Sequence, residues 1–469
     1  MGDAAKQKKE QPMGRMVIHS FLFFSFLTLF TRALFLEVFT LKTGSMEPTL
    51  IGRLDQGDTV LLCPLLGTPS NHRRFDVLKF EHPNNRRVTY LKRLLGLPGD
   101  QIFFHGGDLY LADESFGGTL DEGLRIGRVA ILRKPDQVQE DLFAVHPIAA
   151  GADLDSPNGP GIGPFFEEEH SGQFVQEGRY RRSNPDRRGI LEYQRPLVNG
   201  SRDAASVGGD ILLHPGQHPV GDLSVTWELT ADSKRGAFTI EIWDPWQGVP
   251  VALRWDLETS EASLLREDRV LGSTRVPALT EARTVTFENV DDRLRLKVDG
   301  RLALERHFSH ALRAPAPREQ TRLRFFAENA SLLLRPISIL RDIHYLPGPA
   351  ARVIVPPGKG FFLGDHVASS ADSRLFGRVA IEDLRTGIVL LGDRAGATAS
   401  SVVLNPSNPW QDVDGSWIFC DLLGRHHVFP DDKLFRKVAS WSTPFVPLDA
   451  LKGRAVAVLW PMSRMKWLR

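Results

Sequence analysis

Hydrophobic and polar positions divide the chain into one long apolar run and many short ones. Residues 1–16 are polar and carry several basic side chains, whereas residues 17–39 are dominated by apolar ones. A run of about 20 such residues is long enough to cross a bilayer as a helix, and a basic flank favours the inner side. We therefore predict a cytoplasmic tail over 1–16 and a single transmembrane anchor over 17–39. This places the protein in the plasma (inner) membrane with the remaining chain on its outer face.

The alternative for this segment is a cleaved signal peptide, which has the same order of basic and apolar residues. Cleavage sites usually carry small residues, but this run ends in Phe35-Leu36-Glu37-Val38-Phe39. The pattern therefore favours a retained anchor.

Beyond residue 40 the apolar runs are short, rich in β-branched and aromatic residues, and separated by turn signals, which predicts a mainly β protein. Regularly spaced runs over 220–345 predict an inserted β-sandwich. Residues 105–219 are rich in Gly, Pro and Asp, and we interpret them as an irregular insertion. Residues 289–300 resemble a hairpin of concanavalin-like jelly rolls, which leaves a glycan or a protein open as partner of the sandwich.

The amino-acid composition limits the classes of protein to which this chain can belong. A chain of 469 residues exceeds one ordinary core, so we expect two or more domains. The formal net charge of +1 argues against a broadly basic nucleic-acid binder. Two cysteines, Cys63 and Cys420, exclude a disulfide framework, although one bridge is open. No residue spacing indicates a metal site, and no metal or organic cofactor is expected.

Three separate segments carry the candidate chemistry. Ser45 lies in Thr43-Gly44-Ser45-Met46-Glu47-Pro48-Thr49-Leu50, directly after the apolar run. Lys92 lies within an apolar strand pattern over 88–95 that a Leu97-Pro98-Gly99-Asp100 turn follows. A serine needs a base to act as nucleophile, and burial lowers the pKa of a lysine enough for it to accept a proton. The alternation predicts that Arg93, next to this lysine, faces solvent.

The third segment runs from Gly364-Asp365-His366 to Ser370-Ala371-Asp372-Ser373-Arg374. Two other residues could supply the base. Lys42 lies three residues before Ser45, where a contact with lipid headgroups is the simpler interpretation. His366 would need a carboxylate to orient it, and we interpret it as a loop variant.

Together these segments resemble the membrane-bound type I signal peptidases, which use a serine nucleophile and a lysine general base. The resemblance implies that Ser45 is the nucleophile and Lys92 the base. It implies an oxyanion hole made by the Ser45 amide and the Thr43 hydroxyl, and a hydrogen bond from Ser370 to the lysine. It also implies that Asp372 and Arg374 pair to hold the loop near the base, with Asp365 in support.

The same resemblance gives a substrate groove and a substrate. The residues expected in the groove are Met46, Pro48, Asp76, Val77 and Tyr90. The family has glycine where this chain has Phe75, and asparagine where it has His366. The substrates implied are secretory preproteins, cut after small side chains at the first and third positions before the bond.

The resemblance places the catalytic domain at 40–104, 350–391 and 440–469, with a second small insertion at 392–439. Residues 377–391 and 446–460 both resemble the family's closing segment, so the strand that completes the catalytic sheet stays open. Two other functions remain as alternatives: a self-cleaving Ser-Lys regulator, and a catalytically weak or silent membrane-tethered sandwich that binds glycan or protein.

Overall fold

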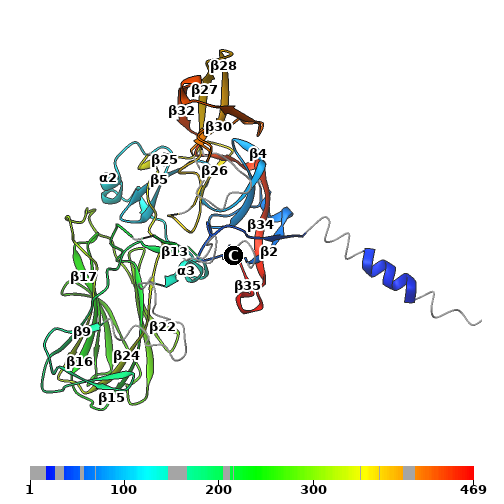
Figure 1. The fold of residues 1–469 in the computed structure, drawn as a ribbon. Helices are drawn as coiled ribbons and strands as arrows, with labels where there is room; N and C mark the ends of the chain where they lie inside the picture. Colours follow the sequence, from blue (N-terminus) through cyan, green and yellow to red (C-terminus); the bar gives the residue numbers. More distant parts are fainter. Residues whose placement is uncertain are drawn as a thin grey trace, which may run out of the picture.

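A computed structural model describes residues 17–26, 36–52, 57–68, 70–145, 166–203, 212–214, 216–348, 350–368, 370–394 and 407–468. The chain builds a body that carries the three candidate segments, called the catalytic body below after the role expected from the sequence. A β-sandwich lies below it in Figure 1, and a narrow β-ribbon lies at the opposite end. The mainly β class predicted from the sequence is confirmed.

The catalytic body is built on an eight-stranded sheet in the order β1-β2-β34-β3-β4-β26-β33, with β35 beside β34. Its strands are β1 (Glu37–Thr40), β2 (Thr59–Cys63), β3 (Val77–His82), β4 (Asn85–Gly96), β26 (Lys359–Leu363), β33 (Val446–Pro447), β34 (Leu451–Trp460) and β35 (Lys466–Trp467). Alternate side chains of β3 and β4 fall into two different buried clusters, because successive residues of a strand face opposite sides of the sheet.

The segment that closes this sheet is β34, which lies between β2 and β3. Residues 377–391, the other candidate, instead form β27 (Gly377–Asp383) and β28 (Ile388–Asp393) of the separate ribbon. The ribbon also contains β32 (Phe435–Ser442) and a small sheet of β29 (Trp410–Gln411), β30 (Trp417–Cys420) and β31 (His426–Phe429). The catalytic boundaries expected at 391 and 440 are therefore wrong, since the ribbon spans 377–442.

A second, four-stranded sheet in the order β25-β5-β6-β7 completes the body. It consists of β5 (Asp100–His105), β6 (Asp108–Asp113), β7 (Ala130–Ile131) and β25 (Arg352–Ile354), accompanied by the short helices α2 (Leu120–Arg125) and α3 (Asp136–Leu142). The expectation of irregular structure from residue 105 is wrong here. The glycines at 106 and 107 form the turn of the β5–β6 hairpin, and both have positive φ.

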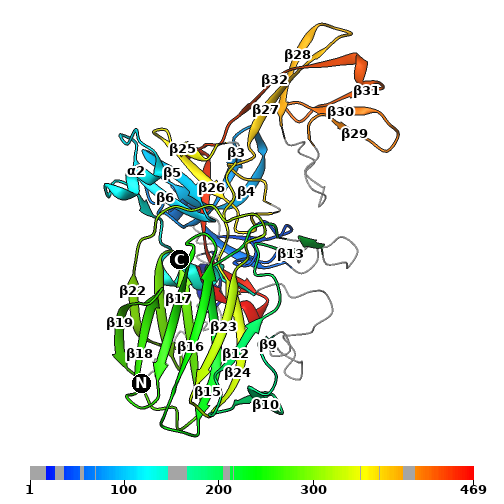
Figure 2. The same cartoon turned by 90° about the vertical axis from the view of Figure 1, so that its left-hand side faces the viewer.

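Two large sheets lie in the region where an inserted β-sandwich was expected, and their strands begin well before residue 220. One sheet runs β10-β11-β24-β15-β20-β21-β22 with β8 beside β24, and the other β19-β18-β17-β16-β23-β12-β9 (Figure 2). The first contains β8 (Ala144–Val145), β10 (Phe174–Glu177), β11 (Tyr180–Ser183), β15 (Leu223–Ala231), β20 (Arg283–Val290), β21 (Arg293–Val298), β22 (Arg301–His307) and β24 (Leu332–Arg341). The second contains β9 (Phe166–Glu168), β12 (Gly189–Tyr193), β16 (Ala237–Asp244), β17 (Val249–Asp256), β18 (Glu261–Arg266), β19 (Arg269–Arg275) and β23 (Arg322–Glu328).

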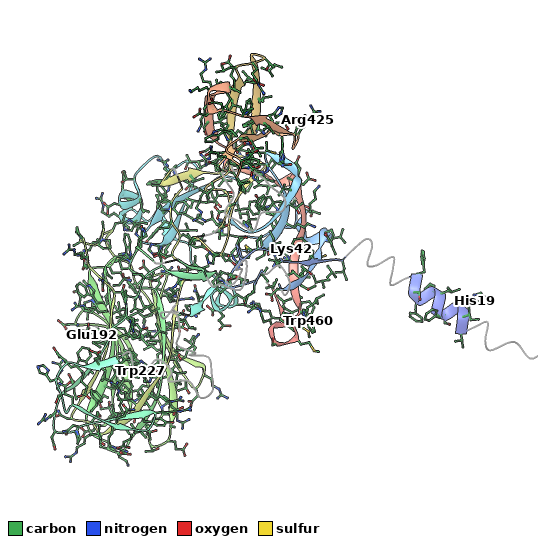
Figure 3. The ribbon with its side chains drawn as sticks, in the orientation of Figure 1. His19, Lys42, Glu192, Trp227, Arg425 and Trp460 are labelled. Atoms are coloured by element: carbon green, nitrogen blue, oxygen red, sulfur yellow. The ribbon has the colours of Figure 1, made fainter. Side chains whose placement is uncertain are left out.

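Residues 166–193, expected to be irregular, thus supply four strands of the sandwich. Its core is one large apolar cluster, which includes Trp227 between the two sheets. Glu192, by contrast, lies on the second sheet (Figure 3). The insertion begins and ends at one place, because Ala144 of β8 pairs with Arg341 of β24. A separate two-stranded sheet joins β13 (Ser201–Asp203) and β14 (Leu212–His214).

At the N-terminus, residues 17–26 form a helix with mostly exposed apolar side chains. Among the described residues, none of the helices combines the length and apolar character that a bilayer crossing needs. Residues 37–39, the expected end of the anchor, lie in strand β1, which pairs with β2 and packs Phe39 against a buried cluster. Cys63 and Cys420 are both free thiols.

Candidate active site

The structure brings Ser45 and Lys92 into direct contact. Lys92 lies on β4, between β3 and β26, and its Nζ is 2.6 Å from the Ser45 Oγ. Ser45 lies in a compact turn in which the amide of Glu47 donates to the carbonyl of Gly44. The Ser45 carbonyl accepts a hydrogen bond of 3.2 Å from the His366 amide, so the third segment holds the backbone of the first.

The environment of Lys92 favours its neutral form. The side chain is only 2% exposed, and its other hydrogen-bond acceptor is the carbonyl of Leu91, at 3.2 Å. Burial lowers the pKa of Lys92 from 10.5 to about 8, although the nearby carboxylates of Asp372 and Asp365 act in the opposite direction. About a tenth of this amine is therefore neutral at pH 7, against fewer than one in a thousand for an unperturbed lysine, and the neutral form is the one that a general base requires. The alternative base, Lys42, is exposed.

The loop that carries the third segment is held by an ion pair. Arg374 donates to both carboxylate oxygens of Asp372, at 2.8 and 2.6 Å, and Asp372 also accepts from the amide of Gly364. The predicted pairing of Asp372 with Arg374 is confirmed. Gly364 lies so close to the site that a β-carbon there would be 2.5 Å from the Ser45 carbonyl and 2.0 Å from the Ser370 hydroxyl.

Ser370 departs from its expected contact. Its side chain is buried beside Gly364, but among the described residues its hydroxyl forms no hydrogen bond. The expected bond from Ser370 to Lys92 is therefore not made in this structure. The Lys92 amine instead forms hydrogen bonds with the Ser45 hydroxyl and the Leu91 carbonyl.

Arg93 joins all three segments, and the prediction that it faces solvent is wrong. It is buried, and its guanidinium donates to both carboxylate oxygens of Asp365 at 2.8 and 2.6 Å. It also donates to the Thr49 hydroxyl at 3.0 Å and to the Phe75 carbonyl at 2.9 Å. Alternation failed here because neighbouring residues of β4 are buried on both faces of the strand, as the exposures of Lys92 and Arg93 show. The only sequence signal was that Thr49, Arg93 and Asp365 all lie inside the resembling segments.

Phe75 occupies a backbone conformation that suits glycine. Its φ is 74°, in the left-handed region, and its side chain is buried in a cluster with Leu95 and Phe361. The resembling family has glycine at this position, whereas this chain places a packed aromatic ring on a backbone with positive φ. The turn directs the Phe75 carbonyl to Arg93, so the substitution leaves this link between segments intact.

The residues expected in the substrate groove differ in exposure. Met46, Asp76 and Val77 are buried, and their place in a groove stays a prediction. Met46 and Val77 pack in a cluster with Leu62 and Val458, and Asp76 accepts a hydrogen bond of 2.7 Å from the Arg73 amide. Pro48 and Tyr90 are partly exposed, Thr43 is exposed beside Ser45, and the Tyr90 ring centroid lies 5.3 Å from the Lys92 Nζ.

A serine hydroxyl held against a buried, partly neutral amine defines a candidate serine hydrolase. Residues 14–142 match the family model described as signal peptidase, peptidase S26. Over these residues the chain is similar to that family, and the similarity supports a serine endopeptidase.

Curated relatives agree over a limited length. Signal peptidase I of Pseudomonas aeruginosa PAO1 is 34% identical over 89 residues, which cover 16% of this chain and 30% of that protein. Signal peptidase I of Rickettsia typhi is 30% identical over 132 residues, covering 24% of this chain and 48% of that protein. The chain thus spans less than half the length of these relatives.

Solved structures match the chain only loosely. A carbohydrate binding module, CBM66 from Bacillus subtilis, aligns over 37% of this chain and 94% of its own, at 12% identity and a TM-score of 0.25. A protein of unknown function with a galectin-like fold, also from Bacillus subtilis, aligns over 43% of this chain and 99% of its own, at 9% identity and a TM-score of 0.29.

Proposed function

We propose that this protein is a membrane-bound serine endopeptidase that removes signal peptides from secreted preproteins, with Ser45 as nucleophile and Lys92 as general base. The observation that carries the proposal is the 2.6 Å contact between the Ser45 hydroxyl and a buried amine whose pKa is lowered to about 8. The similarity of residues 14–142 to the signal peptidase family supports the choice of substrate.

In the proposed reaction the neutral Lys92 amine accepts the Ser45 hydroxyl proton as Oγ attacks the scissile carbonyl. The Ser45 amide and the Thr43 hydroxyl stabilise the oxyanion that forms. The carbonyl then reforms as the C–N bond breaks, and the Lys92 ammonium gives its proton to the departing amine. Water next attacks the acyl-enzyme, with the lysine again as base, and this releases the product acid and restores Ser45.

The membrane setting rests on exposed apolar surface. Residues 17–26 present a helix of exposed phenylalanines and aliphatic side chains, which water does not favour. In the sheet, Thr40 of β1 pairs with Thr59 of β2, and Thr59 pairs with Trp460 of β34, so the end of β1 and this tryptophan are separated by one strand. Lys42 and Trp460 lie on one side of the body (Figure 3). The following exposed apolar residues lie in or directly beside strands β1, β34 and β35: Leu36, Val38, Trp460, Met462, Met465 and Trp467.

We propose that residues 17–35 enter the plasma membrane and that these exposed residues of the sheet face the bilayer. The catalytic body then lies outside the membrane and the N-terminus inside. The identity of the sandwich as concanavalin-like, and its binding of a glycan or a protein, stay predictions.

The test is cleavage of a preprotein by the detergent-solubilised full chain beside Ser45→Ala, Lys92→Ala and Lys42→Ala variants. We expect the first two to lose processing at the signal-peptide junction, because they remove the nucleophile and the base, and Lys42→Ala to keep it. Normal cleavage by Lys92→Ala would contradict the mechanism. Failure of the unaltered protein to cut several preproteins would favour the alternative of a silent, membrane-tethered binding protein.

A further inference from the structure

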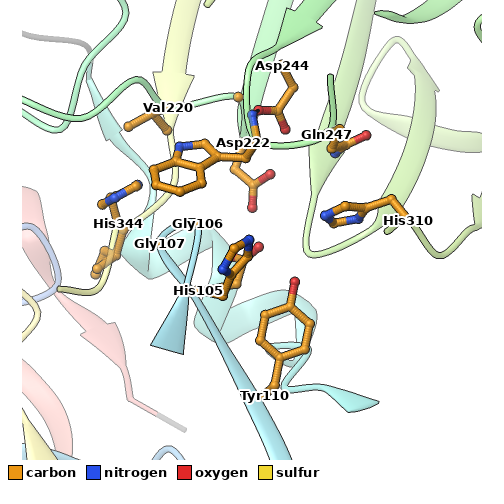
Figure 4. Close-up of a pocket in the computed structure, with 14 residues that line it drawn as sticks. His105, Gly106, Gly107, Tyr110, Val220, Asp222, Asp244, Gln247, His310 and His344 are labelled. Carbon is orange, nitrogen blue, oxygen red and sulfur yellow. Dashed lines mark hydrogen bonds between the residues drawn. The ribbon is translucent and has the colours of Figure 1, made fainter. Parts of the chain in front are cut away.

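Three aspartates from distant segments meet where the sandwich joins the catalytic body. Asp108 begins β6 of the body, Asp222 precedes β15 of the sandwich, and Asp291 lies in the turn between β20 and β21. One carboxylate oxygen from each lies within 4.8 Å of the other two. Figure 4 shows Asp222 and its neighbours around the cavity at this junction.

The cluster holds more negative charge than the surrounding residues neutralise. Three further carboxylates, those of Asp244, Asp292 and Asp342, lie close enough to act on it electrostatically. Lys134 contacts Asp291 at 2.6 Å and Asp342 at 2.8 Å, and His310 contacts Asp292 at 2.8 Å. In the part of the chain that the structure describes, neither Asp108 nor Asp222 forms an ion pair.

The electrostatic consequence is visible in the carboxyl groups themselves. Burial, reinforced by the neighbouring carboxylates, raises the pKa of Asp108 and Asp222 well above its usual range. Burial likewise raises the pKa of Asp291, although Lys134 opposes this, and it raises that of Asp244 to about 6. Carboxylates crowded in this way are stabilised either by protons or by a bound cation.

A separate observation indicates a missing ligand. Gln247 is 7% exposed and lines the same cavity as Asp108 and Asp222, yet its Oε1 accepts no hydrogen bond from any described residue. A buried amide oxygen without a donor is costly, and a cation or a water bound to a cation would satisfy it. The cavity measures about 20 Å³, which is room for one small ion or one water.

We propose that Asp108, Asp222 and Asp291 bind one Ca²⁺ ion, with the Gln247 amide oxygen completing the site directly or through water. Carboxylate and amide oxygens are the ligands that this cation prefers, at about 2.3–2.6 Å. Two oxygens that both contact one Ca²⁺ lie at most about 5 Å apart, and the separations of these three oxygens stay within that limit. Mg²⁺ binds at about 2.0–2.1 Å and holds its ligands no more than about 4 Å apart, so it needs a tighter cluster.

Such an ion would connect the two parts of the molecule. Asp108 belongs to the β5–β6 hairpin of the catalytic body, while Asp222 and Asp291 belong to the sandwich, so ligands from both sides share one cation. The hairpin already contacts the sandwich, because a His105 ring nitrogen lies 2.9 Å from the Arg313 carbonyl. The inference is independent of the peptidase proposal, since no group of the proposed catalytic site takes part.

The experiment is a calorimetric titration of Ca²⁺ into the full chain, purified in detergent and first treated with a chelator that is then removed. We expect one ion to bind per chain, and thermal unfolding to move to higher temperature. At free Ca²⁺ about 100 times Kd, the folded-to-unfolded ratio should rise about 100-fold. Asp108→Asn and Asp222→Asn preserve side-chain size and should each abolish binding. Asp268→Asn, at an exposed hairpin turn of the sandwich, is the matched control and should bind normally.

Each variant is checked for folding by the fluorescence of the buried tryptophans. In the absence of Ca²⁺, Asp108→Asn should unfold at a higher temperature than the unaltered chain, because it removes repulsion within the cluster. The proposal is overturned if the unaltered chain shows no binding up to about 10 mM Ca²⁺. It is equally overturned if folded Asp108→Asn and Asp222→Asn proteins bind Ca²⁺ as the control does, or if Mg²⁺ binds as tightly as Ca²⁺.

Discussion

Replacing Lys92 by methionine should inactivate the protein and make it more stable. A lysine whose pKa falls from 10.5 in the unfolded chain to about 8 in the folded one destabilises the fold at pH 7 by roughly 3 kcal/mol. Methionine has a similar length and no charge. Its loss of the hydrogen bond to Ser45 costs about 1 kcal/mol, so a net gain of about 2 kcal/mol in the free energy of unfolding remains.

The pH dependence identifies the cause of this gain. Between about pH 8 and 10.5 the unfolded chain binds more protons at residue 92 than the folded chain, so the stability of the unaltered protein rises with pH in this window. The advantage of Lys92→Met should therefore shrink to nothing, or reverse, by about pH 10. Denaturant unfolding in detergent at pH 7 and pH 10 measures both values.

Lys359→Met, at an exposed position on the neighbouring strand β26, is the control and should show no such gain. The reasoning fails if Lys92→Met is no more stable than the unaltered protein at pH 7. It also fails if the difference between the two proteins is the same at both pH values.

Three other predictions follow from the site. Because the base must be neutral, kcat/KM for preprotein cleavage should rise about tenfold per pH unit below the lowered pKa of Lys92 and level off above about pH 8; a flat profile from pH 6 to 9 would contradict this. Asp365→Ala should destabilise the fold by about 3–5 kcal/mol because it leaves Arg93 buried and unpaired, and adding Arg93→Met should recover much of the loss in denaturant unfolding. Phe75→Gly and Phe75→Ala should both destabilise by several kcal/mol, but glycine less so by about 1 kcal/mol, because only glycine relieves the positive φ; equal losses would show that the backbone is not strained.

Local pattern was enough to predict the parts of the site that follow from single residues and their neighbours. An apolar strand around Lys92 implied burial, and burial is the cause of its lowered pKa. The pairing of Asp372 with Arg374 was expected from the resemblance to the signal peptidases, and the two residues lie within one loop. The sandwich was found because short β-forming runs between turns leave few other architectures.

The predictions that failed concern residues whose burial or secondary structure is set by tertiary contacts. Arg93 follows the alternation of a surface residue, and only the turn that carries Thr49 and the loop that carries Asp365 bury it. Residues 166–193 look irregular alone and become strands because existing sheet edges of the sandwich pair with them. The carboxylate cluster was invisible in the sequence, since Asp108, Asp222 and Asp291 are far apart and match no metal-binding spacing.

The pairing of Ala144 with Arg341 bears on how this molecule arose. An insertion whose two ends are adjacent strands can be gained or lost in a single genetic event, because a short loop reconnects the host without altering its strand order. The eight-stranded sheet of the catalytic body takes no strand from residues 144–341, so this sheet is complete without them. The sandwich is in this sense a removable inserted domain, and shorter descendants or ancestors of this gene could retain the complete serine–lysine arrangement.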